Sequence, residues 1–266
     1  MVKSSAYAAR MPDKDGNIAY TVDDDRVWAD LFAAQMPNVK RCSAPPVLAG
    51  YKKLNLPADR VPQCNDVSET LRALTGWRVT PVPALIGFAQ FFDLLAQRIF
   101  PAASFIRSRK DFDYIEEPDI FHEIFGHTPL LADPRFAEFS QAIGRAGQAA
   151  DKSDYAWLIR LYWFSIEFGL TRVKGEIKAL GSGLSSSRTE LMYSVGSDVP
   201  QRRPFDVLDI LRTPYRIDIH QPVYFVIEDL DDLFAVAERD LLADVARAKT
   251  LGLFAPLYPV IDKQAG

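Results

Sequence analysis

The sequence predicts an α+β fold that is mainly α-helical, with one small β element. Apolar residues recur at helical spacing through most of the chain up to Leu170. Short β-prone runs, separated by turns rich in Gly, Ser and Pro, occur in the last third. The length suits one large domain and the composition forces no division, so we expect a single domain over residues 1–266.

Acidic residues and prolines mark the expected elements of the first half. The three acids Asp23–Asp25 favour a helix start, because carboxylates stabilise the positive end of a helix. Pro57 and Pro62 interrupt one helical pattern and Pro101 ends another, since proline disrupts a helix interior. In chain order we expect a loose N-terminal arm over 1–20, a helix led by the three acids, broken helical segments over 50–74, and helices over 85–99 and 119–127.

The second half combines two helices with the β element and a final helix. Small residues such as Gly144 and Gly147 predict close packing of the first helix. Aromatic residues lie nearly all round the second, so it should be buried. The expected elements are helices over 134–149 and 154–170, β-prone runs over 177–179, 215–219 and 223–227, and an amphipathic helix over 229–249.

Charge and composition exclude several classes of protein. The 31 basic and 35 acidic residues give a net charge of −4, which lacks the basic footprint of a protein that binds nucleic acid or anionic lipid. The first ten residues lack the apolar stretch of a secretory signal, and polar side chains within 81–105 rule out an ordinary membrane span. Cys42 and Cys64 form no C-x-x-C pattern and are expected to be free thiols. We therefore expect a cytoplasmic protein.

Two of the three histidines, His122 and His127, lie five residues apart. Neutral imidazole is the commonest metal ligand, so the pair favours a metal site. Residues four apart nearly eclipse in an ideal helix, whereas residues five apart diverge by about 140°. Both rings can reach one ion if the helix ends or distorts near His127. Gly126 and Pro129 permit such a change, because glycine allows unusual backbone conformations and proline interrupts a helix. The alternative is one helix-surface histidine and one turn histidine.

A third ligand is expected from a carboxylate that the fold buries. Glu167 is the best candidate because its neighbours are mostly apolar, and a buried, unpaired carboxylate needs a cation, a metal or a proton. A salt bridge to Arg160 or Arg172 is the alternative. Glu123 points away from the adjacent His122 in a helix, so a supporting or cofactor-contact role fits it better, with surface exposure as its alternative.

Two imidazoles and one carboxylate fit a facial triad that holds iron(II) and leaves positions open for oxygen chemistry. Zinc hydrolases use the same ligand types, so the ligands alone do not decide the metal. The five-residue step departs from the H-E-x-x-H pattern of zinc proteases, which counts against a hydrolase with Glu123 as general base. A helical interaction protein with incidental histidines is a further alternative, and it would need another partner for Glu167.

Several segments resemble the pterin-dependent aromatic amino acid hydroxylases, in the same order along the chain. Residues 117–130 are similar to the family signature, and residues 161–170 look like the helix that carries its third iron ligand. The resemblance runs from about Val79 to about Leu233, is closest to the bacterial members with a catalytic domain only, and leaves residues 1–78 largely unmatched. The segments that carry it are 117–130, 136–144, 161–170, 181–187 with Glu190, 215–218 and 221–226.

The resemblance implies an iron site in a helical basket within a single catalytic domain. On periodicity alone, Phe91 would be assigned to core packing, but the resemblance implies that the pterin stacks on it. The implied iron ligands are His122, His127 and Glu167, the implied tetrahydropterin contacts are Ile86, Phe91, Glu123 and Tyr162, and His122 and Glu123 are the implied catalytic residues.

The resemblance also implies how an amino acid substrate is held. Arg107 matches the residue that grips the substrate carboxylate, and a planar guanidinium suits bidentate binding. Without the resemblance, Arg107 would be expected on the solvated surface, the serines in a flexible loop, and the large aromatic residues in the core. The implied substrate contacts are Arg107, Pro118, Trp163, Phe168, Ser186, Ser187 and Ile217.

Some positions depart from the family pattern and bear on the substrate. Ile115 replaces a threonine of the animal members, which puts that contact in doubt, and His220 stands where an aromatic residue is common. Trp163 resembles the phenylalanine and tyrosine branches. Ile217 is aliphatic where the tyrosine branch has an acid, so a phenol hydroxyl would lack a polar partner. Phenylalanine is therefore favoured, with tyrosine or tryptophan as the alternative substrate.

The activity that the resemblance implies is phenylalanine 4-monooxygenation. Iron(II) and tetrahydropterin activate dioxygen, and one oxygen atom enters the ring of L-phenylalanine para to the side chain, giving L-tyrosine. The protein supplies ligand geometry, stacking surfaces and exclusion of water. The chain has no room for the regulatory domain or tetramerisation helix of the animal enzymes, so we expect a monomer.

Overall fold

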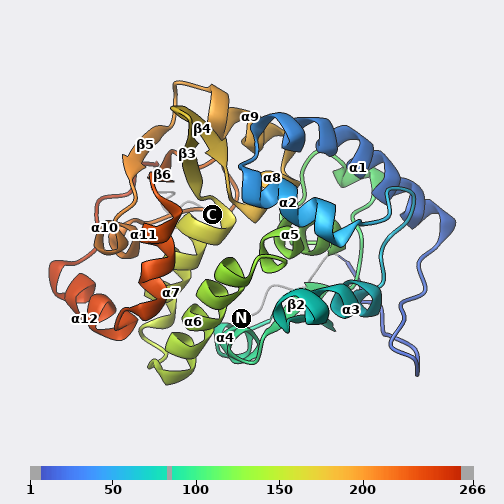
Figure 1. Cartoon of the computed structure of the whole chain (residues 1–266), viewed down its shortest axis with the longest axis horizontal. Coiled ribbons are helices and arrows are strands. Elements are labelled where there is room, and N and C mark those ends of the chain that lie inside the picture. The colour runs from blue at the N-terminus through green and yellow to red at the C-terminus, as the bar shows by residue number, and fades with distance from the viewer. Residues whose placement is uncertain (1–6, 83–85, 259–266) are drawn as a thin grey trace, which may run out of the picture.

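Helices form most of the structure, and two small sheets complete it. The computed structural model describes residues 7–82 and 86–258. In Figure 1, β3 to β6 gather at the upper left and β2 lies at the lower right, with α5 and α6 between them in that view. The predicted α+β, mainly helical class is confirmed. Within the described ranges, no helix is both long and apolar enough to cross a membrane.

The first helices and strands, up to the end of the central region, have the following bounds. They are α1 (Val22–Cys42), α2 (Pro45–Leu54), α3 (Cys64–Thr75), β1 (Arg78–Val82), α4 (Phe88–Ala96), β2 (Ile99–Ala103), the 3₁₀-helix η1 (Arg109–Asp111), the π-helix η2 (Phe121–His127), α5 (Thr128–Leu131), α6 (Pro134–Ala149), α7 (Tyr155–Tyr162) and the π-helix η3 (Trp163–Glu167). The remainder are β3 (Leu170–Val173), β4 (Glu176–Ala179), α8 (Ser182–Ser186), α9 (Arg188–Gly196), β5 (Gln201–Pro204), α10 (Val207–Arg212), β6 (Val223–Ile227), α11 (Leu230–Ala235), the 3₁₀-helix η4 (Val236–Glu238) and α12 (Leu241–Leu251).

The two-stranded sheet was not predicted. Strands β1 and β2 pair in parallel, whereas the sequence predicted one helix over 85–99 that Pro101 would end. The helix α4 stops at Ala96, and Arg98 has a positive φ of 59°, which interrupts helical geometry. Every residue of β2 is buried, so its sequence lacks the alternation that identifies a half-buried strand. The predicted start at residue 85 lies outside the described residues.

The four-stranded sheet has the order β4-β3-β6-β5, and β4 and β6 confirm two of the predicted β-prone runs. The run over 215–219 is a loop rather than a strand, so that prediction was wrong. The helix predicted over 154–170 ends at Glu167, and Leu170 begins β3. The single helix predicted over 229–249 is divided, because Asp229 and Asp240 cap separate helices, α11 and α12.

Close packing of α6 against α4 depends on two glycines, as predicted. A Cβ atom at Gly144 would lie 2.4 Å from the backbone nitrogen of Ala96, and one at Gly147 would lie 2.1 Å from the ring of Phe92. Since neither distance is physically possible, the two helices approach as closely as they do only because both residues are glycine. This contact fixes α4, the helix that carries Phe91.

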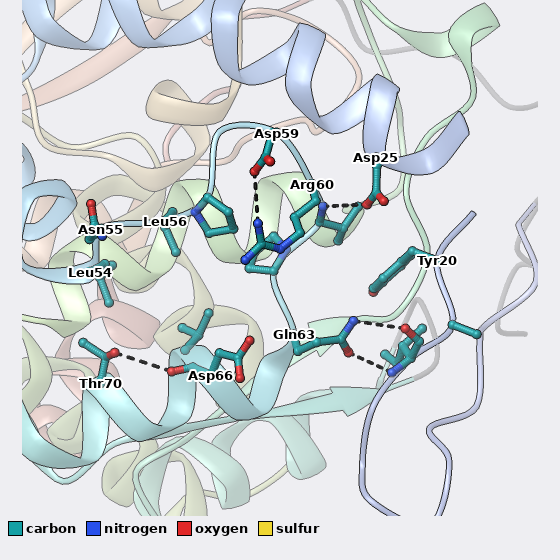
Figure 2. Close-up of a pocket in the computed structure, with 16 residues that line it drawn as sticks. Tyr20, Asp25, Leu54, Asn55, Leu56, Asp59, Arg60, Gln63, Asp66 and Thr70 are labelled. Atoms are coloured by element: carbon teal, nitrogen blue, oxygen red, sulfur yellow. Dashed lines mark hydrogen bonds and ion pairs between the residues drawn. The ribbon is translucent and has the colours of Figure 1, made fainter. Parts of the chain in front are cut away.

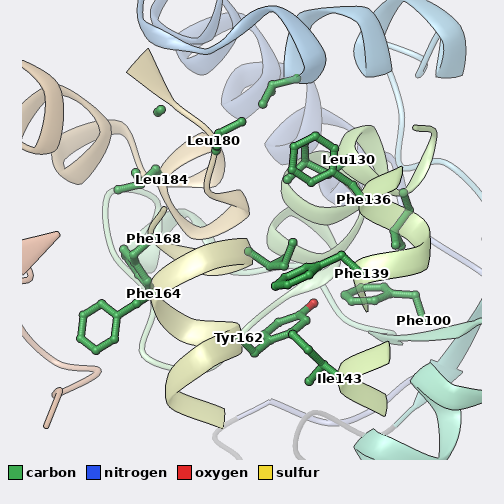
Figure 3. Close-up of a cluster of buried hydrophobic side chains, with 14 of the residues drawn as sticks. Phe100, Leu130, Phe136, Phe139, Ile143, Tyr162, Phe164, Phe168, Leu180 and Leu184 are labelled. Atoms are coloured by element: carbon green, nitrogen blue, oxygen red, sulfur yellow. The ribbon is translucent and has the colours of Figure 1, made fainter. Parts of the chain in front are cut away.

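Aromatic side chains from many elements fill the core, as Figure 3 illustrates with Phe136 and Phe139 of α6 and Phe164 of η3. All three are at most 1% exposed. Fully burying one such ring contributes roughly 1.5–3 kcal/mol to folding. The prediction that the aromatic segment over 154–170 is buried is confirmed for most of it, including Leu158 and Leu161.

The N-terminal segment, predicted as a loose arm over 1–20, has no helix or strand in its described part. Residues 7–20 nevertheless contact the body of the protein. Tyr7 stacks on Phe105 with ring centroids 4.7 Å apart, and Gln63 exchanges two hydrogen bonds with the backbone of Ile18 (2.8 and 3.1 Å; Figure 2). A cavity of about 610 Å³ lies beside this contact, and none of the residues that line it is a predicted site residue.

Candidate metal centre and its two cavities

The histidine pair lies on a π-helix, η2, and this geometry explains how two residues five apart can point in the same direction. Hydrogen bonds in a π-helix run from residue i to residue i+5, so residues five apart lie on one face. The Nε2 atoms of His122 and His127 are 3.2 Å apart. The expectation that a helix distortion aims both rings at one point is therefore confirmed, and the distortion extends over the whole of η2.

Glu167 completes the cluster from a second π-helix, η3. Its Oε1 lies 2.9 Å from His127 Nε2, and its Oε2 lies 3.8 Å from His122 Nε2. The alternative of a salt bridge is wrong: Arg172 pairs with Glu228 at 2.9 Å, and Arg160 donates to the carbonyl of Leu211. Glu167 therefore points its carboxylate at the two imidazoles.

Glu123 is a second carboxylate near the histidines. One of its oxygens and one nitrogen of each imidazole all lie within 4.8 Å of one another. Glu167 is the better candidate for a third ligand, because its oxygens approach the imidazole nitrogens directly, at 2.9 and 3.8 Å. Glu123 is 9% exposed, so the alternative of ordinary surface exposure is wrong. Burial, together with the nearby Glu167 and Asp119, raises the pKa of Glu123 well above its usual range.

Hydrogen bonds to the outer nitrogens orient both imidazoles. Ser186 Oγ lies 2.8 Å from His122 Nδ1 and donates to the carbonyl of Ser182. The serine therefore accepts the proton of Nδ1, which leaves a lone pair on His122 Nε2. The hydroxyl of Tyr162 lies 3.3 Å from His127 Nδ1 and supports the second ring in the same way.

The protonation states of the cluster also suit a metal ion. Burial lowers the pKa of His122 to about 4, which keeps this imidazole neutral near pH 7. Burial by itself would raise the pKa of Glu167, but the charges and hydrogen bonds of the histidines outweigh it and lower the pKa to about 2. An ionised Glu167 and a neutral His122 with its lone pair on Nε2 are donors of the kind that an iron(II) facial triad uses.

Two cavities meet at this cluster. The Phe91 cavity, about 230 Å³, and the Arg107 cavity, about 460 Å³, share Pro118, His122, Trp163 and Glu167 in their walls. Each residue predicted to contact the pterin lines the first cavity, and each residue predicted to contact the substrate lines the second. The Phe91 cavity has Ile86, Phe91, Glu123 and Tyr162, and the Arg107 cavity has Arg107, Pro118, Trp163, Phe168, Ser186, Ser187 and Ile217.

Arg107 is buried rather than solvated. Its guanidinium makes a bidentate contact with Asp119, at 2.8 and 2.9 Å, and Asp119 is fully buried. The same carboxylate accepts the backbone N–H of His122 at 3.0 Å. Burial would raise the pKa of Asp119, but the Arg107 guanidinium holds it below its usual value. Asp119 thus joins the arginine of the second cavity to the backbone of a histidine of the cluster.

The aromatic wall of the Arg107 cavity is stacked. Trp163 lies against Tyr215, with ring centroids 4.2 Å apart, and against Phe168 at 4.5 Å. Trp163 is partly buried and packs against the core, and Phe168 belongs to it, so the alternative of a place in the core is met by Phe168 and in part by Trp163, although both also line the cavity. Ile217 is 56% exposed and lies at the rim. Residue spacing gave no signal for the supporting contacts of Ser186, which lies 64 residues from His122.

Comparison with known proteins identifies the family. The sequence model of the biopterin-dependent aromatic amino acid hydroxylases matches residues 1–246. The chain belongs to this family. The match includes residues 1–78, so the expectation that the resemblance begins near Val79 was wrong. The predictions of a pterin-dependent monooxygenase and of iron and a reduced pterin as cofactors are confirmed.

Similar proteins come from several bacteria. This hydroxylase is 47% identical to the phenylalanine-4-hydroxylase of Pseudomonas aeruginosa, over 99% of this chain and 100% of that protein. The cold-active phenylalanine hydroxylase of Colwellia psychrerythraea 34H superposes with a TM-score of 0.91 at 45% identity, over 94% of this chain and 97% of that one. The Chromobacterium violaceum enzyme with bound oxidized Fe(III) has a TM-score of 0.88 at 34% identity, over 96% and 92% of the two chains.

Proposed function

We propose that this hydroxylase converts L-phenylalanine to L-tyrosine with iron(II), tetrahydropterin and dioxygen. One observation carries the proposal: His122 and Glu167 lie in the wall shared by the Phe91 cavity and the Arg107 cavity. A metal held there faces a cofactor in one cavity and a substrate in the other. The similarity to the phenylalanine-4-hydroxylase of Pseudomonas aeruginosa supports the same substrate.

In this proposal His122, His127 and Glu167 hold the iron through the atoms that converge at 2.9 to 3.8 Å. When bound, iron and reduced pterin would activate dioxygen, which provides the oxygen atom that enters the substrate ring. Phe91 offers its ring face to the pterin, and Tyr162 meets it edge-on, with centroids 5.3 Å apart. Aromatic stacking of this kind holds a flat heterocycle and excludes water from the metal.

The Arg107 cavity suits an amino acid with an apolar ring. Asp119 holds two nitrogens of the Arg107 guanidinium, and the remaining N–H groups can bind the substrate carboxylate. Ile217 offers no polar partner to a phenol hydroxyl, which favours phenylalanine over tyrosine. The side chains proposed to hold the amino acid end and the ring are Ser186, Ser187, Pro118, Trp163 and Phe168.

One assay tests the proposed reaction. The protein is loaded with iron(II) without oxygen, mixed with tetrahydropterin and phenylalanine, and then exposed to oxygen while tyrosine is measured. We expect tyrosine to form only when all four components are present. A folded, iron-loaded protein that forms no tyrosine would refute the proposal, and hydrolysis that depends on zinc would favour the rival hydrolase.

Two variants decide which carboxylate is the third ligand. Glu167→Ala should abolish tight iron binding while leaving the fold largely intact, because it removes the oxygen 2.9 Å from His127. Glu123→Gln keeps the size of the side chain and should leave iron affinity close to wild type, while raising the KM for the pterin. Iron affinity is measured by competition with a chelator. The opposite pattern would assign the ligand role to Glu123.

We further propose that the enzyme is monomeric and cytoplasmic. Among the described residues, the exposed large apolar side chains come from several different helices and loops rather than from one helix face, which supports the monomer. Cys42 and Cys64 are buried free thiols, which suits a reducing compartment. Sedimentation equilibrium tests the first point, and a mass twice that of the chain would contradict it; cell fractionation tests the second.

A further inference from the structure

Gln221 is a buried polar side chain that lies outside the walls of both cavities. It is 1% exposed and comes shortly before β6. Its amide nitrogen donates to the carbonyls of Arg216 (2.7 Å) and Ile219 (3.1 Å), and its amide oxygen accepts one hydrogen bond. Each polar group of the side chain therefore has a partner. A buried network of this kind is costly to break, because the groups left behind lose their partners.

The hydrogen bond to the amide oxygen comes from Trp163. The indole Nε1 of Trp163 lies 3.2 Å from Gln221 Oε1, and an indole has no other polar atom. Tyr215 stacks on the indole with ring planes 18° apart and Phe168 is tilted against it by 36°, and the directional hydrogen bond to Gln221 adds a constraint on the angle of the indole within its plane. Gln221 therefore holds the polar edge of an indole that lines the Arg107 cavity.

The other end of the same amide closes the loop that carries Ile217. The two carbonyls that accept from Gln221 belong to Arg216 and Ile219, which flank Ile217 in sequence. This loop has no helix or strand of its own. One side chain therefore holds both the indole wall and the aliphatic rim of the cavity.

Glu190 anchors the backbone of Gln221. One oxygen of its carboxylate accepts the N–H of Gln221 at 2.8 Å and the O–H of Tyr224 at 2.8 Å. Glu190 is 7% exposed, lines the Arg107 cavity, and lies in the first turn of α9, which Ser187 caps. These hydrogen bonds therefore connect Ser187 to Trp163 through Glu190 and Gln221. They do not pass through His122, His127 or Glu167.

We propose that Gln221, anchored by Glu190, is a positioning residue that determines which aromatic ring the Arg107 cavity accepts. It fixes Trp163 and the Ile217 loop in one arrangement, so the cavity fits a phenyl ring and rejects the larger indole of tryptophan. This inference rests on the proposed function, since it assigns the Arg107 cavity to the substrate. Gln221 touches neither substrate nor cofactor in this scheme.

Equilibrium binding tests the proposal without requiring turnover. Calorimetry on the iron-loaded protein, without oxygen, measures the affinities for phenylalanine and tryptophan in wild type and in Gln221→Met, which keeps the length of the side chain but removes its hydrogen bonds. We expect the preference for phenylalanine over tryptophan to fall about tenfold, the change typical of a single pocket contact. The dissociation constant for tetrahydropterin, measured in the same way, should stay within about twofold, because Gln221 reaches the shared wall only through Trp163 and hydrogen-bonds to none of the proposed pterin contacts Ile86, Phe91, Glu123 and Tyr162.

Matched variants separate positioning from general stability. Gln148→Met changes an exposed glutamine of α6 and should alter neither affinity. Glu190→Gln keeps an oxygen acceptor for Gln221 and Tyr224 and should retain the preference, whereas Glu190→Leu should lose it. If Gln221→Met does not fold, Gln221→Glu decides: it keeps the acceptor for Trp163 but loses the donors to the loop, so the preference should still fall.

The outcomes are distinct. A folded Gln221→Met, or Gln221→Glu in its place, with an unchanged preference would overturn the inference. An equal loss of phenylalanine affinity and pterin affinity would also overturn it, because that pattern means general loosening. A wild-type protein that binds phenylalanine selectively yet forms no tyrosine would refute the proposed function. The ratio of the affinities for phenylalanine and tryptophan would still test the inference about ring selection.

Discussion

Replacing Gly144 by alanine should loosen the α4–α6 contact and weaken pterin binding. The added Cβ would lie 2.4 Å from the backbone nitrogen of Ala96, against the 3.4 Å at which ordinary contact begins, so the helices must separate by the difference of 1.0 Å. Forcing a methyl group into a packed interior costs roughly 1–3 kcal/mol. Alanine recovers up to about 1 kcal/mol through its higher helix propensity. Because this Cβ would meet backbone atoms, which cannot rotate away, the cost lies at the upper end of that range, roughly 2–3 kcal/mol, and the net loss should be about 1–2 kcal/mol.

The assay compares Gly144→Ala with Gly196→Ala, whose Cβ would meet no atom within 4 Å. Thermal unfolding should show the first variant melting roughly 2–8 °C lower, given the 2–4 °C per kcal/mol expected at this size. The control should melt at or above the wild-type temperature. Because α4 carries Phe91, the KM for tetrahydropterin should rise roughly tenfold in Gly144→Ala only. Equal melting temperatures for both variants would refute the packing argument.

Three further predictions concern buried charges and supports. Asp119→Asn leaves the Arg107 guanidinium buried without its ionised partner, so urea unfolding should show a loss of roughly 3–5 kcal/mol, and an unchanged midpoint would contradict this. Tyr162→Phe removes the hydroxyl beside His127 Nδ1 and should weaken iron affinity about tenfold in a chelator competition, with no change in melting temperature. Burial raises the pKa of Glu190 from 4.5 to about 7, so this group stabilises the fold below pH 4.5 and its contribution is lost as the pH rises through 7. Unfolding free energy measured from pH 4.5 to 7 should fall less steeply in Glu190→Gln, by up to roughly 3 kcal/mol over the range, and identical slopes would exclude this role.

The sequence pointed to the His122, His127 and Glu167 cluster more clearly than to its surroundings. Scarce histidines and a carboxylate among apolar residues are chemical signals that do not depend on long-range packing, and Glu167 was found in that way. The family resemblance placed Arg107 and Phe91. By contrast, Ser186 and Gln221 act through contacts across 64 and 58 residues, which no local spacing records.

The errors in the fold have related causes. Strand β2 is buried throughout, so its apolar run looked like the end of the preceding helix. The helix predicted over 229–249 was divided because Asp240 can serve equally as an interior residue or a cap, and only tertiary contacts select between them. Close packing at Gly144 was predictable because glycine weakens a helix interior, so its presence there indicates a neighbour that leaves no room for a side chain.

The π-helical turn that carries the histidines has a consequence for how this site can change. Each hydrogen bond of a π-helix spans one residue more than the hydrogen bond of an α-helix. Deleting one residue between His122 and His127 would relax η2 to an α-helix and give the four-residue step of zinc sites. The number of residues between the two histidines, rather than the identity of any one residue, therefore distinguishes this geometry from that of α-helical metal sites. Variants with single residues deleted from η2 would test this dependence, whereas variants with single substitutions would not.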